Sequence, residues 1–135
     1  MSGDYVRVRL GGEHYAASVA GVREISSVVD VTPVPGSAPG VLGVWNLRGD
    51  VVAAIDLAAM LGVPSGPPSR IVVVEDGELH AGLAVEEVLD VGPLPGAVEP
   101  AEHPHLSGSV LVDRDPVGIL DLASILGAAR GEVSA

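Results

Sequence analysis

The sequence predicts an all-β protein of two small five-stranded β-barrels packed together, with short helical turns. Three observations support this fold class. The core must be built from Val, Leu, Ile and Ala, because Phe and Cys are absent and the only aromatic residues are Tyr5, Tyr15 and Trp45. The 135 residues include 18 Gly and 11 Pro, a content typical of many tight turns. Short apolar segments also recur in two similar halves, each about the size of a very small domain.

The first half predicts two hairpins joined by a crossover. Residues 5–10 alternate between apolar and polar, which indicates a half-buried strand, and residues 14–19 return after Gly11 and Gly12. Residues 41–47 and 51–55 form a second strand pair around a turn at residues 48–50. Between the pairs, residues 22–25 are too short to classify, and three prolines at residues 33–39 indicate an extended loop.

The second half repeats this order of elements. Strands are expected at residues 71–74, 79–85, 110–112 and 117–120, with turns at residues 76–77 and 113–116. Residues 92–109, rich in Gly and Pro, are expected to form a long loop.

Each half ends in a predicted helical turn. Asp56 is a helix N-cap, followed by apolar residues at helical spacing up to residue 61 and by a stop at Gly62. Asp121 caps the same pattern over residues 121–126, and Gly127 stops it.

The two halves align with each other. Residues 52–62 match residues 117–127 at a separation of 65 positions, and residues 19–25 match residues 85–91 at a separation of 66. We therefore expect a first repeat and barrel over residues 1–68, a second over residues 69–128, and a flexible tail at residues 129–135. Together they form one domain, and in such a duplicate a strand can cross over between barrels.

Charge and composition exclude several functions. Seven Arg, no Lys and 18 acidic residues give a net charge of −11, so we expect no binding to nucleic acid. The longest apolar stretch is interrupted by Asp56, so we expect no direct membrane insertion, and the first residues lack a signal-peptide pattern. A soluble cytoplasmic protein is the expectation.

The sequence offers no catalytic or metal-binding constellation. His103 and His105 lie near acidic residues but lack a tetrahedral ligand set, so no metal and no cofactor are expected. Ser26 and Ser27 are better explained as turn residues than as nucleophiles, since no nucleophile elbow is present. The adjacent Glu86 and Glu87 are expected on a solvated face. These patterns indicate that the protein is not an enzyme.

Residues 46–49, Asn-Leu-Arg-Gly, have no equivalent in the second half. A feature present in one copy only is a candidate for an asymmetric function. The alternative is that Arg48 pairs with Asp50 and merely shapes its own turn, and the pattern alone leaves both open.

Residues 42–52, together with residues 55–57 and 61–62, resemble the signature of the CheW-like family of chemotaxis coupling proteins. Supporting segments follow in the family's order, at residues 22–25 and 88–91. The resemblance covers about residues 5–127. It implies two interlocked SH3-like barrels without a catalytic site, and an adaptor that couples chemoreceptors to the histidine kinase CheA in chemotaxis signal transduction.

The resemblance also implies partners and a site. The partners are a CheA-type histidine kinase and the cytoplasmic tip of a methyl-accepting chemoreceptor, at receptor arrays on the inner face of the membrane. The implied receptor-binding surface uses Val22, Glu24, Ile25, Gly43, Val44, Asn46, Leu47, Arg48, Val88 and Val91. We expect these residues to form a groove with an apolar centre, and Glu24 and Arg48 to form an ion pair that is at most partly buried.

Two alternatives remain open, and the second of them belongs to a different functional class. The same module can serve a non-chemotaxis chemosensory pathway, such as type IV pilus or second-messenger control, or act as the regulatory domain of a kinase. A small enzyme or ligand-binding barrel needs a pocket of convergent titratable groups, which the sequence does not offer.

Overall fold

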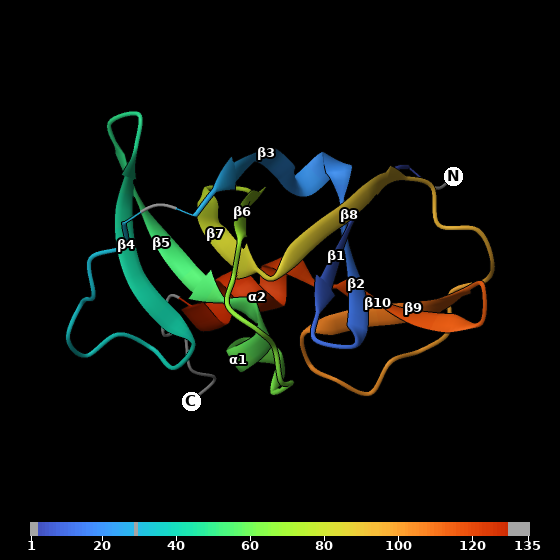
Figure 1. Ribbon diagram of the computed structural model, residues 1–135. Helices are drawn as coiled ribbons and strands as arrows, with labels where there is room; N and C mark the ends of the chain where they lie inside the picture. The colour runs from blue at the N-terminus through green and yellow to red at the C-terminus, as the bar shows by residue number, and fades with distance from the viewer. Residues whose placement is uncertain (1–2, 29, 130–135) are drawn as a thin grey trace.

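The computed structural model describes residues 3–28 and 30–129, and its ten strands form two five-stranded sheets (Figure 1). The prediction of an all-β fold built from two five-stranded units is confirmed. The expected tail at residues 129–135 lies outside the described residues, apart from Ala129. The strands are β1 (Tyr5–Leu10), β2 (Glu13–Ser18), β3 (Val22–Ser27), β4 (Val41–Leu47), β5 (Asp50–Asp56), β6 (Arg70–Asp76), β7 (Leu79–Val85), β8 (Glu87–Gly92), β9 (Leu106–Val112) and β10 (Asp115–Leu120).

The two halves of the chain exchange hairpins. Sheet A has the strand order β8-β1-β2-β10-β9, and sheet B has the order β3-β6-β7-β5-β4. Each sheet therefore combines a hairpin from one half with three strands from the other. The exchange creates parallel pairs, β2 with β10 and β5 with β7, whereas the remaining neighbours are antiparallel. The repeats over residues 1–68 and 69–128 are thus units of the sequence, whereas each sheet contains strands from both of them.

Two crossovers carry the chain between the sheets. One runs from β2 through the short 3-10 helix η1 (Val19–Gly21) into β3, and the other runs from β7 through Glu86 into β8. Both β3 and β8 are edge strands, and they contain the equivalent segments 22–25 and 88–91. Because β8 extends to Gly92 and β9 begins at Leu106, the loop expected over residues 92–109 is shorter than predicted. Small and polar residues at 107–109 concealed the start of β9, which pairs with β10 throughout.

The main hydrophobic core lies where strands of both sheets meet the two helices. It includes Val8 from sheet A, Leu83 from sheet B and Ile125 from the second helix, none of them more than 2% exposed. A smaller cluster inside sheet B surrounds Trp45. The indole of Trp45 covers Gly82, where an added Cβ would lie 2.2 Å from the ring.

Helices α1 (Leu57–Leu61) and α2 (Leu122–Ala129) begin at the predicted caps. The Asp56 carboxylate accepts a hydrogen bond from the Ala59 backbone N–H at 3.2 Å, and Asp121 accepts one from Ser124 at 3.1 Å. Gly62 ends α1 in the left-handed conformation, with φ of 73°. The predicted stop at Gly127 is wrong, because α2 continues through it while burying Ile125 and Leu126. A helical glycine costs only about 1 kcal/mol, which such burial can offset.

Two equivalent hairpins have tight two-residue turns. In the β4–β5 turn both central residues have positive φ, 50° at Arg48 and 94° at Gly49. The β9–β10 turn does the same with 51° at Asp113 and 72° at Arg114. Positive φ at both central positions defines the type I′ turn, whose twist matches that of the flanking strands. Neither helix among the described residues is long and apolar enough to span a bilayer.

Candidate interaction site

The Glu24 and Arg48 side chains form the predicted ion pair. The Arg48 Nη2 atom donates to the Glu24 Oε2 atom at 2.8 Å, and the side chains are 75% and 23% exposed respectively. The prediction of an ion pair that is at most partly buried, with an open guanidinium, is confirmed. The alternative pairing of Arg48 with Asp50 is absent from the ion pairs of the described residues.

The Asn-Leu-Arg-Gly segment presents Arg48 through its backbone geometry. The Asn46 Oδ1 atom accepts a hydrogen bond from the Gly49 N–H at 2.8 Å, which braces the turn. Arg48 occupies the first left-handed position of this turn, so its side chain projects from the tip of the hairpin. Asn46 thus has a defined structural role at the place where the resemblance implies a binding role.

Gly43 is explained by a close backbone approach. An added Cβ would lie 2.2 Å from the Thr32 carbonyl oxygen, because residue 32 forms an isolated bridge with Val44. The second half repeats this arrangement, in which Glu99 bridges Ser109 next to Gly108. In both halves the glycine lets the loop that precedes the edge strand lie against that strand.

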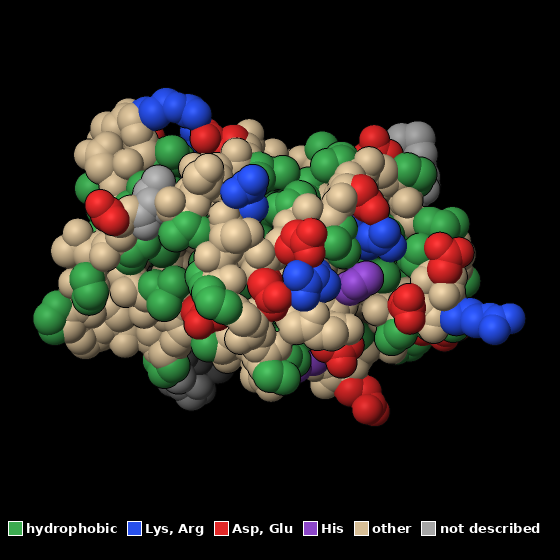
Figure 2. Space-filling view, in the orientation of Figure 1, with side chains coloured by type: hydrophobic (Ala, Val, Ile, Leu, Met, Phe, Trp, Pro, Cys, Tyr) green, Lys and Arg blue, Asp and Glu red, His purple; other side chains and the backbone are tan. Residues whose placement is uncertain are grey.

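The apolar residues expected in the groove differ in exposure. Ile25 and Val91 are 40% and 57% exposed. Val22 and Val88 are partly buried against the main core, and Leu47 is partly buried against the Trp45 cluster. Only Ile25 and Val91 therefore offer a large accessible apolar surface, while the others anchor their strands. Figure 2 shows one face of the molecule as a mixture of apolar, acidic and basic side chains.

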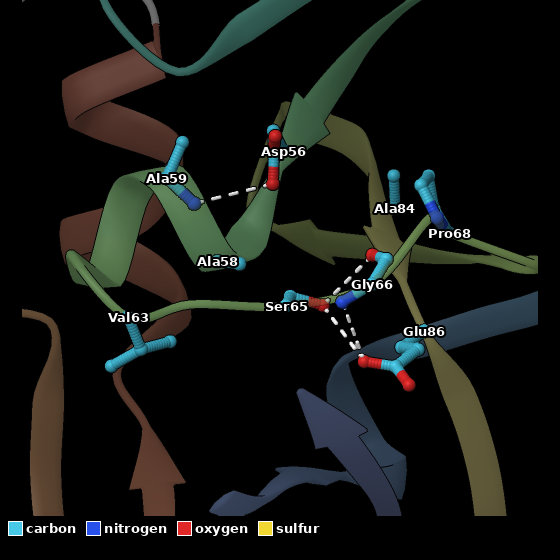
Figure 3. A pocket seen from close by; sticks show the side chains of 9 residues that line it. All are labelled: Asp56, Ala58, Ala59, Val63, Ser65, Gly66, Pro68, Ala84 and Glu86. Atoms are coloured by element: carbon cyan, nitrogen blue, oxygen red, sulfur yellow. Dashed lines mark hydrogen bonds between the residues drawn. The ribbon is translucent and has the colours of Figure 1, made fainter. Parts of the chain in front are cut away.

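The hollows in the surface are small, and other residues line them. One of about 200 Å³ lies beside α1 and includes Asp56, Ser65, Gly66 and Glu86 (Figure 3). A second, of about 170 Å³, is lined by Ala53, Leu79, His80, Ala81, Leu126 and Ala129. A third, of about 110 Å³, is lined by Gly12, Glu13, His14, Asp115 and Pro116. None of these three hollows is lined by a residue of the expected receptor surface.

Glu86 forms a hydrogen-bonded cluster that the sequence did not predict. Its Oε1 atom accepts from the backbone N–H groups of Gly11 and Gly66, both at 2.9 Å, and from the Ser65 hydroxyl at 3.1 Å. Its Oε2 atom accepts from Arg9 Nη1 at 2.8 Å. The hydrogen bonds from Gly11 and Gly66 are the main causes that lower the pKa of the Glu86 carboxyl to about 2.

The expectation that both Glu86 and Glu87 lie on a solvated face is wrong for Glu86, whose side chain is only 19% exposed. Glu87 is 50% exposed and also pairs with Arg9, at 2.8 Å. Periodicity could not separate these two acids, because the partners of Glu86 come from segments distant in sequence. Glu86 also lies where the chain crosses from sheet B to sheet A, a position that only the structure shows.

The two histidines of the long loop serve a structural contact. The Ser124 hydroxyl donates to the Pro104 carbonyl at 3.0 Å, so the His105 Nδ1–H donates to Ser124 across 2.7 Å. In this tautomer His105 does not act as a base toward Ser124. Burial is the main cause that lowers the pKa of His105. Residues 3–28 and 30–129 contain no group of three or more His, Cys, Asp or Glu side chains that could hold a metal ion.

The fold and the site define a class of protein. Two sheets with exchanged hairpins carry an exposed ion pair at a hairpin tip, and the open surface around it suits protein contacts better than small-molecule chemistry. The sequence matches the CheW-like domain over residues 4–130, and the chain belongs to this family.

Several relatives share most of the chain. A probable chemotaxis protein CheW of Rhizobium etli is 29% identical, covering 97% of this chain and 92% of the relative. The chemotaxis protein CheW of Rhizobium meliloti is 26% identical over the same shares. Protein PilI of Pseudomonas aeruginosa is 34% identical, covering 64% of this chain and 51% of the relative.

A solved structure confirms the fold. The crystal structure of the scaffolding protein TtCheW from Thermoanaerobacter tengcongensis superposes with a TM-score of 0.81 at 28% identity. The match covers 90% of this chain and 86% of that chain. The similarity therefore includes both sheets and the exchange between them.

Proposed function

We propose that the protein is a non-catalytic adaptor that couples chemoreceptors to a CheA-type histidine kinase in chemotaxis. The observation that carries the proposal is the Glu24–Arg48 ion pair, which lies in the family motif and leaves the guanidinium 75% exposed. Relatives named chemotaxis protein CheW, which match nearly the whole chain, support the pathway. The adaptor would act in the cytoplasm, at receptor arrays on the inner face of the membrane.

The receptor would contact the face that contains β3, the β4–β5 hairpin and β8. Ile25 and Val91 supply accessible apolar area there, and the Arg48 guanidinium keeps donors available for a partner carboxylate. Docking of a helical receptor tip would desolvate the Glu24–Arg48 pair. Removal of one charge would then leave the other unpaired in the interface, and such truncations are costly.

The test compares Arg48→Ala with wild type in two assays. One measures binding to a chemoreceptor cytoplasmic-tip fragment, and the other measures co-sedimentation with a CheA-type kinase and receptor-containing membranes. We expect at least tenfold weaker binding, about 1.4 kcal/mol, with a nearly unchanged melting temperature. Arg70→Ala is a matched control, since this arginine is exposed on β6 and its side chain donates to the neighbouring Ser69 carbonyl at 3.1 Å. Normal binding by Arg48→Ala, or a loss of binding that follows unfolding, would contradict the assignment.

A second candidate function has one specific observation in its favour. Protein PilI is among the relatives, at 34% identity over 64% of this chain. A role in a pilus-related or second-messenger chemosensory pathway would use the same face with a different receptor. Affinity purification of the tagged protein from its native cells, followed by mass spectrometry, separates the two according to which kinase and receptors are recovered.

A further inference from the structure

We propose that Glu86 is a positioning residue, which holds the start of β8 against β1, the β1–β2 turn and the connector at residues 64–69, and so shapes the part of the partner-binding face that β8 supplies. This inference rests on the proposed function. Glu86 is the single residue between β7 of sheet B and β8 of sheet A. Because β8 carries Val88 and Val91, the path of the chain at Glu86 determines where those two side chains lie.

The carboxylate joins segments from three parts of the chain. It binds Gly11 in the β1–β2 turn, Ser65 and Gly66 in the connector between the halves, and Arg9 on β1. We call this cluster the Glu86 clasp. The Glu86 carbonyl also accepts from the Ser69 hydroxyl at 2.6 Å, so the backbone of Glu86 is held as well as its side chain.

The connector at residues 64–69 is held by little apolar packing. Residues 64–69 are all exposed, and the hollow of about 200 Å³ lies next to them (Figure 3). Apolar burial therefore contributes little here, and hydrogen bonds hold the segment. Ser65 and Gly66 donate to the Glu86 carboxylate, and the Ser69 N–H donates to the Val85 carbonyl at 2.9 Å. The approach is close, since a Cβ added at Gly11 would lie 2.6 Å from the Pro64 carbonyl oxygen.

The first half lacks an equivalent clasp. The position equivalent to Glu86 is Ala20, which lies in η1 and is exposed. The crossover into β3 is thus built from a 3-10 turn, and the crossover into β8 is fixed by an anion. This difference between equivalent positions is expected if β8 needs a more exact position than local backbone geometry provides.

The test compares Glu86→Gln with Glu87→Gln. The two variants change the same charge beside the same arginine, but only Glu86 binds the backbone N–H groups of Gly11 and Gly66. For Glu86→Gln we expect at least tenfold faster amide exchange at Gly11 and Gly66 and shifted NMR resonances along β8. Binding of the receptor-tip fragment should weaken at least fivefold. Glu87→Gln should leave amide exchange at Gly11 and Gly66 and receptor binding close to wild type, with β8 resonances shifted only next to the substituted residue.

Ser65→Ala is a milder second variant, in case Glu86→Gln does not fold. It removes one donor to the clasp, and we expect about twofold faster exchange at Gly66. Wild-type exchange and wild-type β8 resonances in the Glu86→Gln or Ser65→Ala variants would overturn the clasp. Faster exchange with unchanged receptor binding would overturn the positioning role. Failure of the wild-type protein to bind the fragment would overturn the proposed function, while the exchange and resonance measurements would still decide whether Glu86 fixes β8.

Discussion

Glu24 and Arg48 join the two edges of sheet B. Glu24 lies on β3 at one edge, and Arg48 lies at the β4–β5 turn at the other, yet their charged atoms are 2.8 Å apart. Sheet B must therefore curve until its edge strands approach each other, as a small barrel does. The pair that the proposed function uses for binding thus also bridges the two edges of sheet B.

The Glu24–Arg48 pair should contribute little to stability. A double-mutant cycle with Glu24→Ala and Arg48→Ala, measured by urea unfolding, should give a coupling energy of about 0–1 kcal/mol, because solvent screens an exposed pair. The Arg7–Asp90 pair, 2.7 Å long with Asp90 54% exposed, provides a comparison cycle and should give a similar value. A coupling energy above about 2 kcal/mol would mean that the pair holds the sheet closed rather than serving a partner.

The Glu86 clasp should make stability depend on pH in acid. The pKa of Glu86 is lowered to about 2 in the folded protein, against about 4.3 for a glutamate in an unfolded chain. The unfolded state therefore binds more protons between these values. The stabilisation is fully present above about pH 4.3 and is lost as the pH falls toward 2.

Urea unfolding at several pH values between 7 and 2.5 measures this effect. Wild type should lose more stability over the acidic interval than Glu86→Gln, and the two curves should converge at the lowest pH. Parallel curves would show that other carboxylates account for the acid sensitivity.

Gly82→Ala should be destabilising, because the new Cβ meets the Trp45 ring at 2.2 Å and the Ile71 side chain at 2.5 Å. A rigid indole cannot move away cheaply, so we expect a loss of about 1–3 kcal/mol in the free energy of unfolding. Gly92→Ala on β8 is the control, since nothing lies within 4 Å of its added Cβ. Equal stabilities of the two variants in urea would contradict this packing.

The two capping aspartates, Asp56 and Asp121, should contribute similar amounts to the free energy of unfolding. Asp56→Ala and Asp121→Ala each remove an acceptor from the first turn of a helix, and each should cost about 1 kcal/mol. Thermal or urea unfolding of the two variants measures this directly. Asp76→Ala, at the exposed end of β6, serves as a surface control and should change stability by less than about 0.5 kcal/mol.

The sequence pattern predicted those elements that are determined by interactions within a few residues. Alternation in residues 5–10, the cap at Asp56 and the glycine stop at Gly62 each act within a few residues, and all three are present. The internal repeat predicted two similar sets of strands, because both copies contain the same local patterns. Gly127 shows the limit, because burial of the neighbouring Ile125 and Leu126 outweighs the preference of an isolated glycine.

Strand pairing and the Glu86 clasp follow from distant contacts. Nothing in residues 14–16 specifies that they pair in parallel with residues 117–119. The same applies to Glu86, whose partners include residues 75 and 77 positions away. The Glu24–Arg48 pair could be predicted because the family resemblance supplied the long-range information that local pattern lacks.

The exchange of hairpins has a consequence for folding during synthesis. On the ribosome, β1 and β2 emerge first, but their neighbours β8 and β10 are synthesised near the end of the chain. A nascent chain of 68 residues therefore cannot complete either sheet. The β1–β2 hairpin lacks its neighbouring strands until the second half has been synthesised. Separately expressed fragments 1–68 and 69–135 should each remain largely unfolded, yet assemble with each other when mixed. Hairpin exchange thus makes the two repeats into a single cooperative unit, in which neither repeat completes a sheet without the other.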